Sequence, residues 1–198
     1  WTRVPLQAPL VQALGAHVHI ANDAVAALQA ERRWGALRGV ADCAYVTWST
    51  GIGVGLCVDG RVLRGKNGNA GHAGHSYVGD VPEGGAPALC GCGNLGDAES
   101  LIAGSALQRR LGVDAPALLH AAGRGDAAAL ADVRGLCVLM GRLLYNLVAT
   151  LDLQRISLGG AVFLHHQSLL LPLLRAVLAR YFPALTDGVE LVPAGLGE

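Results

Sequence analysis

The fold is decided by one segment, which reads TWSTGIGVGLCVDGRVLRGKNGNAGHAGH at residues 47–75 and CGCGNLGDAES at residues 90–100. It combines a glycine-rich turn in an apolar stretch with two histidines that stand three residues apart. A Cys-x-Cys pair follows, and an acidic residue stands five positions after the second cysteine. We expect the rest of the chain to be a scaffold for this segment.

The glycine-rich turn interrupts an apolar run between Tyr45 and Val58. The interrupting residues are Ser49, Thr50, Gly51, Gly53 and Gly55. Glycine inside a strand marks a tight bend or a place where another backbone or a ligand comes close. Hydroxyl groups beside free N–H groups suit a phosphate, but an ordinary hairpin bend would also explain the pattern.

Two antiparallel strands are predicted near residues 43–50 and 52–58. The second ends at Asp59-Gly60, a strong signal for a two-residue hairpin turn, and a third strand is predicted near 61–64. Further along the chain, helices are predicted at 5–14, 23–34, 97–111, 114–123, 126–152 and 168–181. Short strands are predicted at 17–20, 155–158 and 189–192.

The cysteine loop predicts a metal site. The thiolates of Cys90 and Cys92 can converge on one ion, and His75 with Asp97 would complete a four-ligand set for zinc. His72 competes with Asp97 for the fourth position, because a spacing of three residues can bring two imidazoles to one side of a turn. Two reduced cysteines in a loop with surface histidines are the simpler alternative.

Composition predicts a globular protein from a reducing compartment. Of 198 residues, 52% are hydrophobic and 15% are charged, which suits a chain with a substantial core. Lys plus Arg equals Asp plus Glu at fifteen each, so no general charge attracts nucleic acid to this chain. Five cysteines at irregular spacing do not suggest a disulfide framework. We therefore expect a cytoplasmic protein.

No membrane segment or signal peptide is predicted. The chain opens WTRVPLQAPL, without the basic and then apolar order of a signal peptide and without an initiating Met. The longest apolar stretch, residues 135–153, contains Arg142, Asn146 and Asp152. It is therefore predicted to be a buried core helix.

Several ordered motifs together resemble the ROK family of sugar kinases and sugar-responsive repressors. They are Asn22-Asp23, the run 49–53, the run 69–75, Cys90-x-Cys92-Gly93-x-x-Gly96 and Glu99. The resemblance covers residues 4–192. It implies an α/β fold of the actin-like ATPase (ribonuclease H-like) type, in which two domains flank a cleft. Residues 1–40 would end the N-terminal domain, and residues 41–198 would form the C-terminal domain, with a zinc loop at 75–97.

The resemblance also implies roles for individual residues. The catalytic base would be Asp23, although a helix N-cap is its ordinary alternative. The sugar would be bound by Asn22, Asn69, His72, His75 and Glu99. ATP would be bound by Thr50, Gly51, Gly53, Gly159 and Gly160. Zinc would be bound by His75, Cys90, Cys92 and Asp97. Glu99 could instead be a plain acid in the first turn of a helix, and Gly159-Gly160 a simple loop.

Two positions depart from the family pattern. Kinases of the family usually have Glu where His72 stands and a third Cys where Asp97 stands. An imidazole cannot accept hydrogen bonds from two neighbouring hydroxyls as a carboxylate does, so the preference for a sugar is expected to change. A carboxylate keeps a ligand atom for zinc, but it is a harder ligand than a thiolate.

Two functions follow from the resemblance. The first is a glucokinase-type kinase that uses ATP and Mg²⁺ to phosphorylate a hexose or an N-acyl hexosamine. The alternative is a sugar-sensing repressor whose DNA-binding domain is not in this chain. The family's Asp-x-Gly-x-Thr phosphate-binding hairpin is absent here, so we expect residues 1–198 to be a fragment that does not turn over ATP unaided. A homodimer is also implied.

Overall fold

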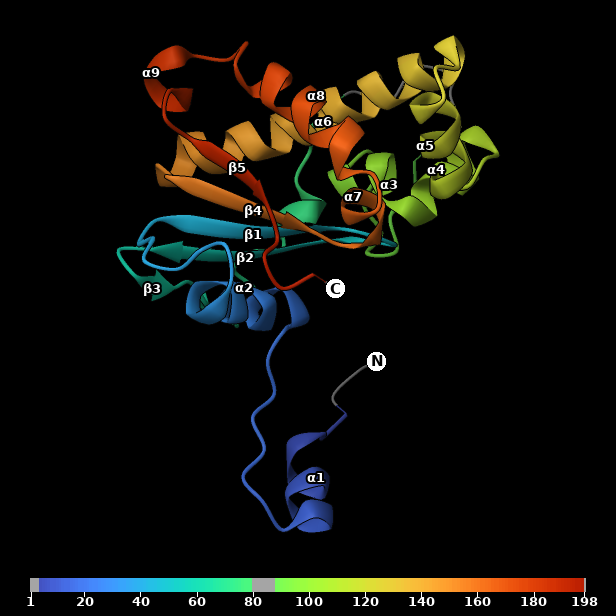
Figure 1. Cartoon of the computed structure of the whole chain (residues 1–198). Coiled ribbons are helices and arrows are strands. Elements are labelled where there is room, and N and C mark those ends of the chain that lie inside the picture. Colours follow the sequence, from blue (N-terminus) through green and yellow to red (C-terminus); the bar gives the residue numbers. More distant parts are fainter. Residues whose placement is uncertain (1–3, 80–87, 198) are drawn as a thin grey trace.

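A five-stranded sheet forms the centre of the computed structural model, which describes residues 4–79 and 88–197 (Figure 1). The strands, in the order β3-β2-β1-β4-β5, are β3 (Arg61–Val62), β2 (Ile52–Val58), β1 (Cys43–Trp48), β4 (Arg155–Gly159) and β5 (Glu190–Pro193). The first three strands are antiparallel, whereas β4 and β5 run parallel to β1. The strands predicted near 43–50, 52–58, 61–64, 155–158 and 189–192 are confirmed, with β3 shorter than expected.

Tight turns set the register of the antiparallel strands. The β1–β2 turn pairs Trp48 with Ile52, and the β2–β3 turn consists of Asp59 and Gly60. Both turn residues have positive φ angles, 50° and 73°, as a two-residue hairpin turn with the right-handed strand twist requires. The Asp-Gly signal in the sequence therefore predicted this turn correctly.

Helices cover the two faces of the sheet unequally. Helix α2 (Asp23–Trp34) lies on one face, over a small core. The main core lies on the other face, where the longest helix is α6 (Figure 1). The further helices, from α3 to α9, are α3 (Ala98–Ile102), α4 (Gly104–Leu111), α5 (Ala115–Gly123), α6 (Ala127–Leu151), α7 (Ala161–Leu164), α8 (Gln167–Leu178) and α9 (Pro183–Thr186).

Helix α6 confirms the predicted core helix. It begins after Asp126, whose carboxylate accepts a hydrogen bond from the Ala129 N–H at 2.9 Å, and it ends at Asp152 in the left-handed conformation. Ten of its residues are buried, including Val133, Met140 and Leu144. Among the described residues, no helix is both long and apolar enough to span a membrane.

The single helix predicted at 97–111 is wrong, because the structure divides it at Ala103 into α3 and α4. The backbone N–H groups of Gly104 and Ser105 donate to the carbonyls of Ser49 and Thr50, at 2.8 and 3.2 Å. These long-range bonds replace bonds within the helix. The start of α4 is thereby attached to the β1–β2 turn.

The N-terminal segment lies apart from the sheet (Figure 1). Helix α1 (Gln7–Leu14) confirms the helix predicted at 5–14 and ends at Gly15 in the left-handed conformation, but none of its residues is buried. The strand predicted at 17–20 is wrong. These residues pair with none of the described strands, and an extended segment needs a partner to become part of a sheet.

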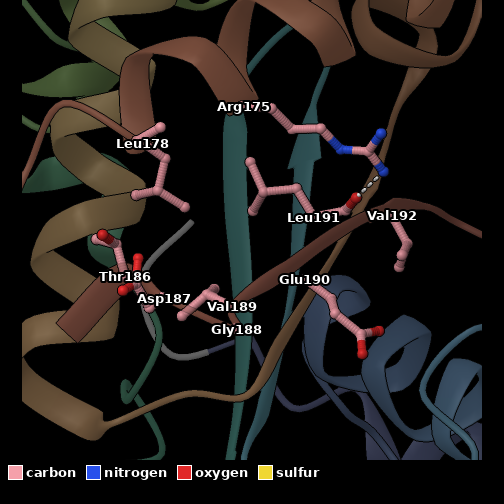
Figure 2. Close-up of a pocket in the computed structure, with 10 residues that line it drawn as sticks. Arg175, Leu178, Thr186, Asp187, Gly188, Val189, Glu190, Leu191 and Val192 are labelled. Carbon is pink, nitrogen blue, oxygen red and sulfur yellow. Dashed lines mark hydrogen bonds between the residues drawn. The ribbon is translucent and has the colours of Figure 1, made fainter. Parts of the chain in front are cut away.

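The sheet ends at β5, where a cavity of about 470 Å³ lies against α8 and α9 (Figure 2). Arg175 reaches across it, and its Nη2 donates to the Leu191 carbonyl at 2.7 Å. Pro193, the last residue of β5, has no N–H to offer a further strand. These two features reduce the capacity of the open edge to pair with another chain.

Candidate functional site

The candidate site is a cavity of about 430 Å³ where the start of α2, the β1–β2 turn and the 72–75 loop meet. Its lining consists of Asn22, Asp23, Thr47, Ser49, Thr50, Gly51, Ile52, Gly53, His72, His75 and Glu99. Eight of these are residues for which a sugar, phosphate or catalytic role was predicted. Segments distant in sequence therefore meet in one polar cavity.

Three of the residues predicted to bind sugar or ATP do not line this cavity. Asn69 is exposed on the loop before His72. Gly159 ends β4 beside Thr47 of β1. Gly160 has a φ of 85°, and a Cβ there would lie 2.5 Å from the Thr47 hydroxyl oxygen. The Gly159-Gly160 pair thus lies directly behind a residue of the cavity wall.

The start of α2 brings two polar side chains to the cavity. Asn22 is the N-cap of the helix, because its Oδ1 accepts a hydrogen bond from the Val25 N–H at 3.2 Å. Asp23 is the first helical residue, and its Oδ1 accepts from the Ala24 N–H at 2.8 Å. The N-cap alternative for Asp23 is therefore wrong. Its carboxylate lies at the positive end of the helix dipole.

The β1–β2 turn is held by contacts on two sides. Within the turn, the Ser49 N–H donates to the Gly51 carbonyl at 3.0 Å. From α3, the Oε2 of Glu99 accepts a hydrogen bond from the Ile52 N–H at 3.0 Å. A Cβ at Gly51 would lie 2.9 Å from the same carboxylate oxygen. The turn is therefore fixed before any ligand arrives.

The histidine loop, residues 71–75, lies directly against the part of β2 that does not pair with β3. Gly71 and Gly74 make this possible, since a Cβ at either position would overlap the carbonyl oxygen of Val54 or of Ile52. The rings of His72 and His75 are stacked, with their centroids 6.0 Å apart. Both line the cavity, so the spacing of three residues does bring the two imidazoles together.

A four-residue cluster lies behind the cavity wall. One ligand atom from each of His75, Cys90, Cys92 and Asp97 lies within 4.8 Å of all the others. The closest separations are 3.2 Å from His75 Nδ1 to Asp97 Oδ2 and 3.5 Å from Cys92 Sγ to the same oxygen. The Cys90 Sγ lies 3.5 Å from His75 Nδ1. The structure places Asp97 in this cluster and His72 outside it.

The cluster fits a zinc ion. Ligand atoms around a tetrahedral zinc ion, at about 2.0–2.3 Å from the metal, lie roughly 3.3–3.8 Å from one another. Burial raises the pKa of the Cys90 thiol to about 12, so zinc would have to displace its proton. Burial opposes ionisation of Asp97, but hydrogen bonds from Ser100, Cys90 and His75 lower its pKa overall. The cluster therefore places the carboxylate of Asp97, with its lowered pKa, beside the sulfur and nitrogen donors.

Three cavity residues, Thr47, Ser49 and Ile52, were not among the residues predicted to bind sugar or ATP or to act in catalysis, although Ser49 belongs to the glycine-rich turn. Thr47 and Ile52 belong to strands β1 and β2, and they line the cavity because the β1–β2 turn ends there. Thr47 is a polar residue in an otherwise apolar strand, which was a signal that could have been used. Residues 80–87 of the predicted zinc loop lie outside the described residues.

Comparisons with known proteins identify relatives among sugar kinases. The model of the ROK family matches residues 1–198. A glucokinase of Aeropyrum pernix is 34% identical over 91% of this chain and 62% of its own length. An N-acetylmannosamine kinase of Escherichia coli O157:H7 is 36% identical over 79% of this chain and 55% of its own length. The chain thus spans little more than half the length of these relatives.

Comparison with solved structures also identifies ROK kinases as similar proteins. A ROK hexokinase from Thermus thermophilus is 36% identical, with a TM-score of 0.85 over 96% of this chain and 64% of its own. A Streptomyces griseus glucokinase, solved with glucose and AMPPNP, is 30% identical, with a TM-score of 0.83 over 100% of this chain and 69% of its own. A ROK transcriptional regulator, a homolog of the E. coli MLC protein, is 24% identical, with a TM-score of 0.82 over 96% of this chain and 50% of its own. At that identity the likeness shows the fold alone.

The sequence motifs, the sheet order and these similarities agree. The predicted fold class, α/β of the actin-like ATPase type, is confirmed by the likeness to the ROK kinases. The family resemblance is confirmed by a match over the whole chain. The chain belongs to the ROK family.

Proposed function

We propose that the complete protein is an ATP-dependent sugar kinase that phosphorylates a hydroxyl of a hexose or an N-acyl hexosamine. Relatives named glucokinase and N-acetylmannosamine kinase support this class of acceptor. The observation that carries the proposal is one cavity in which Asp23 faces the β1–β2 turn. A base and a phosphate-binding turn are the two parts that such a reaction needs side by side.

In this proposal Asp23 is the catalytic base. Its Oδ1 accepts the Ala24 N–H, while Oδ2 makes no hydrogen bond to any of the described residues and can accept the proton of a sugar hydroxyl. The sugar oxygen then forms a bond to the γ-phosphorus of ATP, and the bond from that phosphorus to the β-phosphate oxygen breaks. The products are a sugar phosphate and ADP, with the proton on Asp23.

The polar residues around Asp23 would hold the sugar. Asn22, His72, His75 and Glu99 line the same cavity, and they offer the mixed donors and acceptors that sugar hydroxyls require. Glu99 already accepts the Ile52 N–H through Oε2, so its free capacity for a sugar is reduced. Asn69 is assigned to the sugar on the family resemblance alone.

Thr50, Gly51 and Gly53 would contact the phosphates of ATP, which enters the site with Mg²⁺. The turn supplies hydroxyl and backbone donors at the cavity, and such donors stabilise negative charge on a phosphoryl group. Gly159 and Gly160 are proposed to contact the adenosine. They lie beside Thr47 at the end of β4, where a lack of side chains leaves room for a nucleotide to approach.

Zinc bound by His75, Cys90, Cys92 and Asp97 would have a structural role. With its Nδ1 directed at the metal cluster, the His75 ring can present its other nitrogen to the cavity. A bound metal would fix the orientation of this ring and so the position of one sugar contact.

The test is a kinase assay on the complete protein with a panel of hexoses and N-acyl hexosamines. We expect Asp23→Asn to lower kcat by at least about 100-fold, because general base catalysis typically contributes that much. Asp132→Asn is the matched control, because Asp132 is exposed on α6 and does not line the cavity. An unchanged kcat in Asp23→Asn would refute the base assignment.

The repressor alternative makes a different prediction for the same experiment. Sugar binding by the wild-type protein, with no phosphoryl transfer to any sugar in the panel, would favour a sugar-sensing role.

We also propose that the complete protein is a cytoplasmic homodimer. A mass measured by light scattering that corresponds to one chain would refute the dimer.

A further inference from the structure

Gly53 and Gly55 lie in the middle of β2, and neither has a positive φ angle. Their backbone conformation is therefore open to any residue, so conformational freedom does not explain glycine at these positions. Gly55 is buried and does not line the cavity, so a ligand does not explain it either. The remaining explanation is that the structure leaves no room for a side chain at these positions.

Helix α2 occupies the space above both glycines. A Cβ at Gly55 would lie 2.6 Å from the carbonyl oxygen of Ala24 and 2.7 Å from the Cβ of Leu28. At Gly53 it would lie 3.1 Å from the Cβ of Ala24. Ala24 and Leu28 are buried against the sheet, at 2% and 0% exposure. The glycines thus let the first turns of α2 rest on the backbone of β2.

This contact determines where the proposed catalytic base lies. Ala24, which touches both glycines, directly follows Asp23 in the chain. The Asp23 side chain has a single hydrogen bond to the described residues, to the Ala24 N–H of its own helix. The distance between Asp23 and the β1–β2 turn is therefore determined by how closely α2 packs on β2.

We propose that Gly55 is a positioning residue for Asp23, with Gly53 in a lesser role. This inference rests on the proposed function, because it assigns Gly55 an effect on the phosphoryl transfer. A methyl group at Gly55 would lie 2.6 Å from the Ala24 carbonyl oxygen, and this separation must increase to an ordinary contact distance of about 3.5 Å. It would displace the start of α2 by roughly 1 Å, and a misplacement of that size can reduce a rate by about 100-fold.

The test is a double-mutant cycle in the complete protein with Gly55→Ala and Asp23→Asn. We expect Gly55→Ala to lower kcat by between about 10- and 100-fold, with little change in the KM for ATP. In the Asp23→Asn background the same substitution should have almost no further effect, because it acts through Asp23. An equal loss in both backgrounds, or no loss in either, would overturn the proposal.

Gly135→Ala is the control for substitution of a glycine as such. Gly135 lies within α6, and a Cβ there meets no atom within 4 Å. If Gly55→Ala does not fold, the same cycle with Gly53→Ala decides the question. The added methyl there meets only side-chain atoms, at 3.0 and 3.1 Å. Because Gly53 is also proposed to contact the phosphates of ATP, the KM for ATP is measured beside kcat. Gly53→Ala is expected to give the smaller loss of kcat, only when Asp23 is present and with the KM for ATP unchanged, and a loss that persists in the Asp23→Asn background would overturn the proposal.

Hydrogen exchange separates this inference from the proposed function. Amides of residues 23–28 should exchange faster in Gly55→Ala than in the wild type or in Gly135→Ala, whatever the protein catalyses. Unchanged exchange would overturn the packing argument. If exchange is faster but Asp23→Asn alone leaves kcat unchanged, the proposed function is refuted, and with it the role of Gly55 in catalysis.

Discussion

At the scale of single residues, Asp97 has two roles that can be separated by mutation. Its Oδ1 accepts the Ser100 N–H at 2.8 Å and caps α3, while its Oδ2 faces His75 and Cys92. We expect Asp97→Ala to lower the bound zinc well below one equivalent per chain, because the donor set would lose its only carboxylate. Elemental analysis of the purified protein measures this.

Two further variants complete the zinc test. His72→Ala should keep its zinc, because His72 lies outside the cluster. Asp126→Ala removes another helix cap and should keep zinc as well, which separates loss of a cap from loss of a ligand. Full zinc in Asp97→Ala together with loss in His72→Ala would show that His72 is the fourth ligand.

Glu31 is a buried acid that no sequence pattern indicated. It is 3% exposed, and its carboxylate accepts hydrogen bonds from the N–H groups of Ala36, Gly195 and Leu196 at 2.7, 3.0 and 2.9 Å. Two of these donors stand more than 160 positions away in the sequence. Local periodicity cannot predict such a contact, because it depends on the completed fold.

Replacement of Glu31 should therefore reduce stability strongly. Glu31→Leu would remove the acceptor of three backbone N–H groups. Water can replace it at Gly195 and Leu196, which are exposed, but less readily at Ala36, which is partly buried. A hydrogen bond to a charged group contributes about 1.5–3 kcal/mol, so we expect a loss of about 2–3 kcal/mol in the free energy of unfolding, measured by urea denaturation. Glu31→Gln keeps one oxygen acceptor and should lose less. Equal losses in the two variants would contradict this explanation.

At the scale of elements, the sequence predicted what local chemistry decides. The β2–β3 hairpin follows from Asp59-Gly60, and α6 follows from its cap and its apolar length. The break between α3 and α4 was missed, because it depends on bonds to the distant β1–β2 turn. The site motifs were located from the resemblance, but the packing role of Gly55 required the position of α2.

The junction of α5 with α8 gives a prediction about pH. The rings of His120 and His166 meet edge to face, with centroids 5.1 Å apart. Burial, followed by the charges of His120 and His165, lowers the pKa of His166 below its ordinary value of 6.5. The unfolded chain therefore binds this proton more readily than the folded chain, so acid favours unfolding.

The stability contributed by neutral His166 is present above pH 6.5 and is lost as the pH falls below that value. We expect the free energy of unfolding to decrease between about pH 7 and pH 5, and His166→Asn to flatten this slope. Urea denaturation at constant ionic strength measures the slope. His17→Asn, on the exposed segment before α2, is the control and should leave the slope unchanged. A slope equal to wild type in His166→Asn would refute the assignment.

At the scale of the whole molecule, the site depends on contacts between parts far apart in the sequence. The cavity joins α2, the β1–β2 turn and the histidine loop, and the cluster of His75, Cys90, Cys92 and Asp97 connects that loop to the start of α3. Glu99 links these parts, since it accepts the Ile52 N–H and lies 3.7 Å from the Cys90 sulfur. Metal binding at this cluster and the shape of the β1–β2 turn are therefore expected to depend on each other.

The two ends of the described chain differ in how they contribute to stability. Between Val4 and Asp23 every residue except Val18 is exposed, whereas Gly195 and Leu196 bind the buried Glu31. Removal of residues 1–20 from this chain should leave its Tm within about 1 °C, because residues 4–20 are almost all exposed. Removal of residues 195–198 should lower the Tm by about 2–6 °C, since two donors to Glu31 disappear. Calorimetry on the two truncated chains and on residues 1–198 makes the comparison. If the N-terminal cut lowers the Tm more than the C-terminal cut does, α1 stabilises the sheet by contacts that its exposure does not indicate.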